Sequence, residues 1–130
     1  MEITTSQADT NNAVTVHHLN GTFRRNEPLE ESVQAAYDAG ARLMVIDFKG
    51  VDYMSSAGLR AIHYSFTLLR SGESKEESDK VRQGIQDGSY TSPQLKLSNV
   101  NDRVMEVFSL TGYDMFLDIF DSLEEALASF

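Results

Sequence analysis

The segment LMVIDF, residues 43–48, constrains the fold more than any other stretch of this 130-residue chain. Its first four side chains, Leu43–Ile46, are all apolar, so no alternate position is left to face water. A strand of this kind is covered on both faces, which is typical of a sheet whose neighbouring strands run parallel. The run is far shorter than the roughly 20 residues that cross a bilayer, so it indicates a buried strand.

Strands and helices alternate along the rest of the chain. Two strands, Glu2–Gln7 and Val14–His18, form a predicted hairpin that ends at Leu19–Gly21, the second strand being half-buried. The later elements are a helix from Pro28 to Gly40, the strand Leu43–Phe48, a turn over Lys49–Ser55, a helix from Ser56, a strand at Leu95–Leu97, a helix between Asn101 and Gly112, a strand at Met115–Phe120 and a helix after Ser122. The alternation predicts an α/β fold with a mixed, mostly parallel sheet of about five strands and about four helices.

The length favours one domain over residues 1–130, interrupted by a polar stretch at residues 71–93. That stretch is predicted to be an insertion or surface loop, and a short helix over Glu76–Gln86 is compatible with it. Because it follows the helix that begins at Ser56, we expect it to emerge at the opposite end of the sheet from Ser56.

Charge and cysteine content narrow the function. The net charge is −9, which disfavours binding to nucleic acid and membrane insertion but leaves a protein partner with a basic face open. The chain has no cysteine, so disulfides, thiol catalysis and cysteine-bound metals are excluded. With no signal peptide visible at the N-terminus, the cytoplasm is the expected location.

The turn VDYMSSAGL, residues 51–59, follows the buried strand and leads into an apolar helix. In a parallel sheet this turn lies at the carboxyl edge, where ligands and partners bind. A serine there can cap the helix, and a phosphate on it would face the positive end of the helix dipole. Gly58 would let another protein's backbone approach closely. The alternative is that Ser55 and Ser56 are only an N-cap and its neighbour.

The segment IDFKGVDYMSSAGLRAI, residues 46–62, resembles the signature of the STAS domain, the family of bacterial anti-sigma factor antagonists. LNGTF, residues 19–23, is similar to the Leu-x-Gly segment that follows the family's second strand. Residues 95–127 are similar to its closing strand, helix, Thr-Gly turn, strand and helix. The resemblance covers about four-fifths of the chain, omitting residues 71–93, and implies a single STAS-like domain.

The resemblance implies a switch and no enzymatic activity. Unphosphorylated antagonists of this family bind an anti-sigma factor that is itself a serine kinase. Phosphorylation by that kinase releases them, and a serine phosphatase reverses the modification. The serine that matches the motif is Ser56, with Ser55 as the alternative because it replaces a frequent aspartate. The family also implies a monomer when free and no cofactor.

The partner surface implied by the resemblance surrounds this turn. Its expected residues are Phe23, Arg24, Ser55, Ser56, Ala57, Gly58 and Arg60. Thr22–Arg24 stands where the family often has Glu-Leu-Asp, so a contact that is acidic in relatives becomes basic here.

Other readings of the sequence are weaker. His17 and His18 adjoin on a strand and point to opposite faces, so we expect no metal site. YMSSAG, residues 53–58, lacks the G-x-S-x-G pattern of a serine hydrolase. A STAS scaffold subunit of a stress-sensing or transporter-associated complex, with no phosphate cycle, is the main alternative function.

Overall fold

The computed structural model describes residues 1–130 as one five-stranded sheet with five α-helices. The elements are β1 (Glu2–Asp9), β2 (Ala13–Phe23), α1 (Glu27–Asp38), β3 (Met44–Met54), α2 (Ser56–Leu69), α3 (Lys75–Asp87), β4 (Leu95–Ser98), α4 (Asp102–Thr111), the 3-10 turn η1 (Tyr113–Met115), β5 (Asp118–Phe120) and α5 (Leu123–Ala128). The predicted α/β fold with a mixed, mostly parallel sheet is confirmed. The helix count is five and not four, because the polar stretch contains α3.

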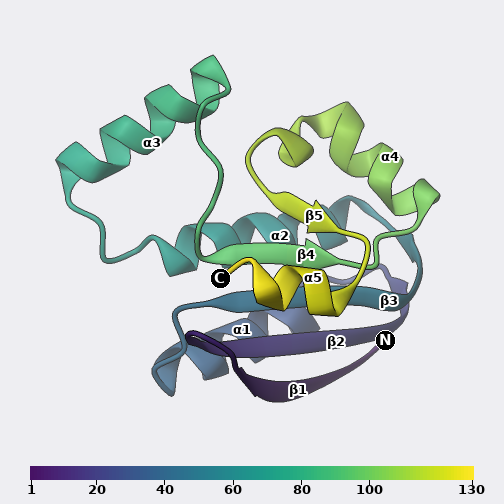
Figure 1. Ribbon diagram of the computed structural model, residues 1–130. Coiled ribbons are helices and arrows are strands. Elements are labelled where there is room, and N and C mark those ends of the chain that lie inside the picture. The colour runs from purple at the N-terminus through teal and green to yellow at the C-terminus, as the bar shows by residue number, and fades with distance from the viewer.

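The strands lie in the sheet in their order along the chain, β1-β2-β3-β4-β5. β1 pairs antiparallel with β2, and the later neighbours are parallel. Right-handed crossovers between strands added in one direction place the connecting helices on one face. Figure 1 shows α1 and α2 behind the sheet and α5 in front of it. The carboxyl ends of β2, β3 and β4 therefore share one edge, at which α2 and α4 begin.

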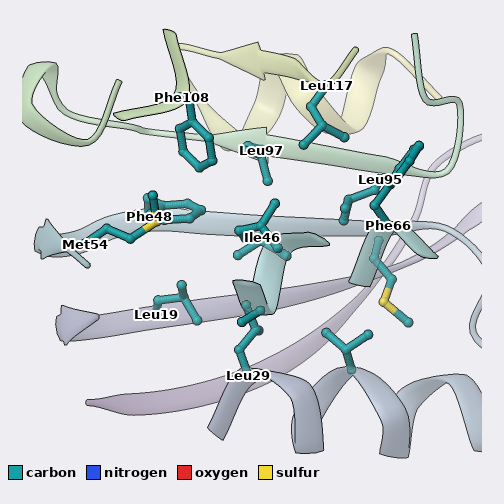
Figure 2. Packing of buried hydrophobic residues seen from close by; sticks show 14 of the residues in the cluster. Leu19, Leu29, Ile46, Phe48, Met54, Phe66, Leu95, Leu97, Phe108 and Leu117 are labelled. Atoms are coloured by element: carbon teal, nitrogen blue, oxygen red, sulfur yellow. The ribbon is translucent and has the colours of Figure 1, made fainter. Parts of the chain in front are cut away.

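The main core lies between the sheet and the helices of the α1–α2 side, and contains 19 buried residues. Figure 2 shows Leu29 of α1 pointing toward the strand side chains Leu19 and Ile46. Phe48 stacks edge-on against Phe108 of α4, with ring centroids 5.9 Å apart. Within the apolar run Leu43–Ile46, the residues Met44–Ile46 are buried and face both cores in turn, as the pattern predicted.

The opposite face has a smaller core of Val14, Val16, Val45 and Ala126, covered by α5. β2 is therefore buried on both faces, and the prediction of a half-buried strand was wrong. His17 is fully buried on the α1 side, where its Nδ1 lies 2.9 Å from Ser32 Oγ. Burial and the neighbouring His18 lower the pKa of His17 to about 4. The two histidines point to opposite faces, as expected.

Two strands extend beyond their predicted ends. β2 continues to Phe23, past the predicted end of the hairpin at Leu19–Gly21. β3 continues to Met54, so most of Lys49–Ser55 is strand and not the predicted turn. The pairing of β2 with β3 contains register shifts between His18 and Asn20 and between Gly21 and Thr22. These irregularities break the two-residue period that a regular strand shows, which is why the apolar pattern ended too early.

The C-terminal strand β5 is shorter than predicted. It begins at Asp118 and not at Met115, because Tyr113–Met115 forms the 3-10 turn η1. The closing helix α5 has the predicted serine cap, with the Glu125 N–H donating to Ser122 Oγ at 3.1 Å. None of the five helices combines the length and the apolar character that a membrane crossing requires.

The polar stretch 71–93 folds into α3, which confirms a helix over Glu76–Gln86 and corrects the prediction of a loop. Ser74 and Glu77 form a reciprocal capping box at its start, and Gly88 ends it in a left-handed conformation. Val81 joins the main core and anchors the helix. In Figure 1, α3 lies at the end of the sheet where the parallel strands begin, away from the start of α2, as expected.

Candidate functional site

Ser55 is the N-cap of α2 and is held at both its backbone and its side chain. Its N–H donates to the Phe23 carbonyl oxygen at 2.9 Å, which ties the turn to the end of β2. Its Oγ accepts from the Ala57 N–H at 3.3 Å. The extended backbone of Ser55, with ψ at 178°, is typical of a capping residue. Ser55 therefore performs the structural role that was considered for both serines.

Ser56 is the first residue of α2 and is exposed. Its hydroxyl makes no hydrogen bond within the protein, in contrast to that of Ser55. The first turn of α2 contains no acidic residue, so no carboxylate on this turn compensates the positive end of the helix dipole. Ser56 thus presents a free hydroxyl to solvent at a position that favours an anion.

Gly58 is buried and faces the core, so the expectation that a partner's backbone approaches it was wrong. A methyl group at Gly58 would overlap Met54 Cγ and would lie 3.0 Å from Phe23 Cγ. Phe23 itself has no exposed surface, so its predicted contact with a partner was also wrong. Both residues belong to the packing that seats the first turn of α2 on the ends of β2 and β3.

A cleft of about 460 Å³ lies beside the start of α2. We call it the serine cleft, and its lining residues are Thr22, Arg24, Asp52, Tyr53, Ser55 and Arg103. The Arg24 guanidinium lies 5.9 Å from the centre of the Tyr53 ring. Thr22 donates to an Asp52 carboxylate oxygen at 3.1 Å. Two arginines therefore flank the turn of a strongly acidic protein.

Arg103 is the functional candidate that the sequence did not reveal, since it comes from α4 and lies far from the serines along the chain. Asn101 brings it to this edge by donating to the Val51 carbonyl oxygen at 3.0 Å and capping α4 through the Val104 N–H at 2.8 Å. The parallel topology was the available signal, because α4, like α2, begins at the carboxyl edge of the sheet.

Comparison with known proteins settles the family. The model of the STAS domain matches residues 5–75, just over half of the chain and including the serines and α2. The chain belongs to the STAS domain family. The match ends at the first residue of α3, so the stretch that the resemblance left out lies almost wholly beyond it.

Relatives of this STAS domain carry the names of sigma-factor regulators. BtrV of Bordetella bronchiseptica, named as an anti-sigma factor antagonist, is 30% identical over 104 residues, covering 80% of this chain and 73% of that protein. The crystal structure of an anti-sigma factor antagonist from Mycobacterium paratuberculosis is 21% identical, with a TM-score of 0.68, over 98% of this chain and 93% of that one. The Bacillus cell fate determinant SpoIIAA in its phosphorylated form is 15% identical, with a TM-score of 0.61, over 96% and 97%.

The remaining predicted surface residues of the STAS domain lie around Ser56. Arg24 and Arg60 are exposed, and Ala57 is half-buried. Arg24 lines the serine cleft, whereas Ala57 and Arg60 follow Ser56 on the first turns of α2. The structure thus gathers a surface of small and basic residues from the end of β2 and the start of α2.

Beneath this edge, Asp47 ties three strands of the STAS domain together. One carboxylate oxygen accepts from Ser98 Oγ at 3.1 Å and Asn99 Nδ2 at 2.9 Å, and the other lies 3.4 Å from His18 Nδ1. Asn99 adopts a left-handed backbone with φ of 56°, which that side-chain bond supports. The aspartate that ends the apolar run therefore acts as a structural acceptor. No three histidine, aspartate or glutamate side chains converge as metal ligands.

Proposed function

We propose that this STAS domain is an anti-sigma factor antagonist controlled by phosphorylation of Ser56. Without phosphate it binds an anti-sigma factor that is itself a serine kinase, and phosphorylation of Ser56 releases it. The names of its relatives support the general role, and the phosphorylated form of SpoIIAA supports a phosphate cycle on this fold. The observation that carries the assignment to Ser56 is its exposed, unbonded hydroxyl beside the engaged hydroxyl of Ser55.

Phosphorylation at Ser56 needs no rearrangement of the STAS domain. The Ser56 oxygen would form a bond to the terminal phosphorus of ATP, the bond from that phosphorus to ADP would break, and the hydroxyl proton would pass to a base of the kinase. Ser55 would stay in place as the cap, so α2 would keep its start. Hydrolysis of the phosphate ester by a serine phosphatase would restore the hydroxyl.

The local charges favour a phosphate on the STAS domain itself. The phosphate adds about −1.5 to −2 charges, which the α2 dipole and the two arginines of the serine cleft, Arg24 and Arg103, would offset against the single Asp52 carboxylate of that lining. A partner surface fitted to a neutral hydroxyl gains no such compensation and would have to accommodate a hydrated anion. We therefore propose that release follows from loss of fit and added repulsion at the interface.

The proposed contact surface consists of Arg24, Ser55, Ser56, Ala57 and Arg60. Phe23 and Gly58 are excluded from it because the core covers them. The arginines give this surface a basic character, so acidic groups of the anti-sigma factor are the expected counterparts.

Phosphate transfer followed by intact mass tests the proposal. The STAS domain is incubated with ATP and each serine kinase encoded beside its gene. We expect a gain of one phosphate that Ser56→Ala abolishes and Ser55→Ala retains. A gain that Ser55→Ala abolishes would move the switch to Ser55. Stable complexes without any phosphate transfer would indicate a scaffold subunit instead.

Binding of the anti-sigma factor gives the second measurement. Ser56→Asp should weaken the affinity about a hundredfold, equivalent to about 2.8 kcal/mol. The circular dichroism spectrum should match that of the wild type, because the Ser56 side chain is exposed and its hydroxyl makes no hydrogen bond within the protein. Unchanged affinity in this variant would contradict the proposed mechanism.

A further inference from the structure

A second cleft, of about 370 Å³, lies at the other end of α2, where α3 and η1 pack beside it. Phe66 from α2, with Tyr113 and Phe116 from and just after η1, supplies the aromatic part of its lining. The basic side chains His63, Arg70 and Arg82 supply its charged part, and Ser78 and Ile85 of α3 complete the lining. We call it the aromatic cleft. α3, which makes one wall, lies beyond the matched STAS region.

The rings of the aromatic cleft form a continuous row. The centroid of Phe116 lies 5.0 Å from that of Phe66 and 5.2 Å from that of Tyr113, and Tyr113 lies 6.1 Å from His63. Tyr113 and Phe116 are half-buried, so each keeps part of its ring open to the cleft. Burial raises the pKa of the Tyr113 hydroxyl, which therefore stays protonated. Such a surface suits a flat apolar ring.

The two arginines of the aromatic cleft differ in their freedom. Arg70 Nε lies 2.8 Å from a Glu73 carboxylate oxygen, and its guanidinium lies 4.9 Å from the centre of the Phe66 ring. Arg82 is paired only with Asp79, at 3.4 Å, and its side chain is 70% exposed. An exposed pair of this kind contributes little energy, so Arg82 can turn toward a ligand.

The basic residues of the aromatic cleft favour a ligand with a negative charge. All its charged lining residues are basic, in a chain of net charge −9. The carboxylates that pair with the arginines, those of Glu73 and Asp79, lie outside the lining. A cation would gain no partner here, whereas an anionic group can reach a bidentate arginine.

We propose that the aromatic cleft binds a small molecule that carries a planar ring and an anionic group. The ring lies against the half-buried Tyr113 and Phe116, because Phe66 beneath them is itself covered, and the anionic group meets Arg82. The volume is that of a small-molecule site, which argues for a compact ligand and not for a peptide segment. The proposal does not depend on the phosphorylation of Ser56, which is at the opposite end of α2.

Titration with phenylacetate, followed by the backbone amide signals of the full chain, tests the proposal. We expect saturable shifts confined to the second half of α2, α3 and η1. Arg82→Glu should weaken binding at least tenfold. Lys80→Glu makes the same charge change on α3 outside the lining and should alter the affinity less than twofold.

The contributions of the ligand's ring and of its charge to binding are distinguished by using other probes. Benzylamine has the ring with the opposite charge, and we expect it to bind at least tenfold more weakly than phenylacetate. Phenyl phosphate, tested alongside, shows whether the site prefers a carboxylate or a phosphate, and binding of either supports an anion site. Equal binding of benzylamine, equal affinity in Arg82→Glu with an otherwise unchanged spectrum, or no saturable shift with either anion would overturn the proposal.

Discussion

The two ends of α2 differ in the chemical groups that surround them. At the amino end, the serine cleft depends on backbone N–H groups, a capping hydroxyl and exposed arginines. At the carboxyl end, Phe66 and Leu69 are buried and the aromatic cleft depends on rings from α2 and from the η1 region. One end can therefore gain or lose a charge without repacking, whereas the other cannot change without disturbing the core.

This difference shows where a small domain can be covalently modified without loss of stability. An exposed hydroxyl at a helix start contributes almost nothing to folding, so modification there leaves the stability nearly unchanged. A buried ring contributes several kcal/mol and fixes its surroundings. Substitutions at the two ends should accordingly differ by more than tenfold in their effect on the folding equilibrium.

The largest effect is expected at the carboxyl end. Phe66→Ala should lower the free energy of unfolding by about 3 kcal/mol, because it leaves a cavity beside Phe116, Tyr90 and the stacked Arg70. Urea denaturation measures the loss, with Ser56→Ala as the control that should stay within about 0.5 kcal/mol. Similar losses in both variants would abolish the contrast between the two ends.

Gly58→Ala probes the one place where the amino end touches the core. The added methyl overlaps Met54 Cγ and crowds Phe23 Cγ, so we expect a loss of about 2 kcal/mol despite alanine's higher helix propensity. Gly72→Ala is the matched control, because a methyl there meets nothing within 4 Å. If thermal unfolding shows no loss for Gly58→Ala, the first turn of α2 is looser than the structure indicates.

Ser55→Ala separates the two serines by stability. Loss of the bond from the Ala57 N–H should cost about 1 kcal/mol, and Ser55→Asp, which keeps an acceptor, should recover most of it. Chemical denaturation of the three proteins provides the comparison. Equal stability of Ser55→Ala and Ser56→Ala would mean that the capping hydrogen bond of Ser55 does not stabilise the fold.

The smallest effect is expected in α3. Ser74→Ala removes one half of the capping box and should cost about 0.5 kcal/mol, observed as faster amide exchange confined to α3. The reason is that only Val81 and Gly84 of this helix are buried, so it can open without the rest of the fold. A matching drop in global stability would show that α3 unfolds together with the core and is not a separable insertion.

Much of this architecture could be predicted from local pattern. Leu43–Ile46 indicated a doubly covered strand, and the capping residues Asn101 and Ser122 marked the starts of two helices. The extension of β3 to Met54 could not be predicted. Its pairing with β2 is irregular there, so its buried residues are separated by two exposed residues and not by one. Periodicity describes regular strands, and this one is irregular where the site begins.

The site itself was predicted only in part. The position of the two serines at the carboxyl edge followed from the order of strand and helix. The choice of Ser56 rested on the resemblance to the STAS signature and stays a prediction. The separate roles of Ser55 and Ser56 depend on which hydroxyl points back at the Ala57 N–H, which sequence spacing does not specify. Arg103 and the aromatic row depend on contacts between distant segments, so only the folded chain reveals them.

The inward position of Gly58 means that this glycine, found in a genomic sequence, indicates the fold and not regulation by phosphorylation. Gly58 has no side chain because Met54 and Phe23 leave no room for one. Any chain with this core needs the glycine, whether or not its serine is phosphorylated. Under the proposed function, the Ser56 hydroxyl two positions earlier has no such structural duty and serves only phosphorylation. On that proposal, a gene product that retains the glycine but has lost the serine would still fold as a STAS domain and would not respond to the kinase.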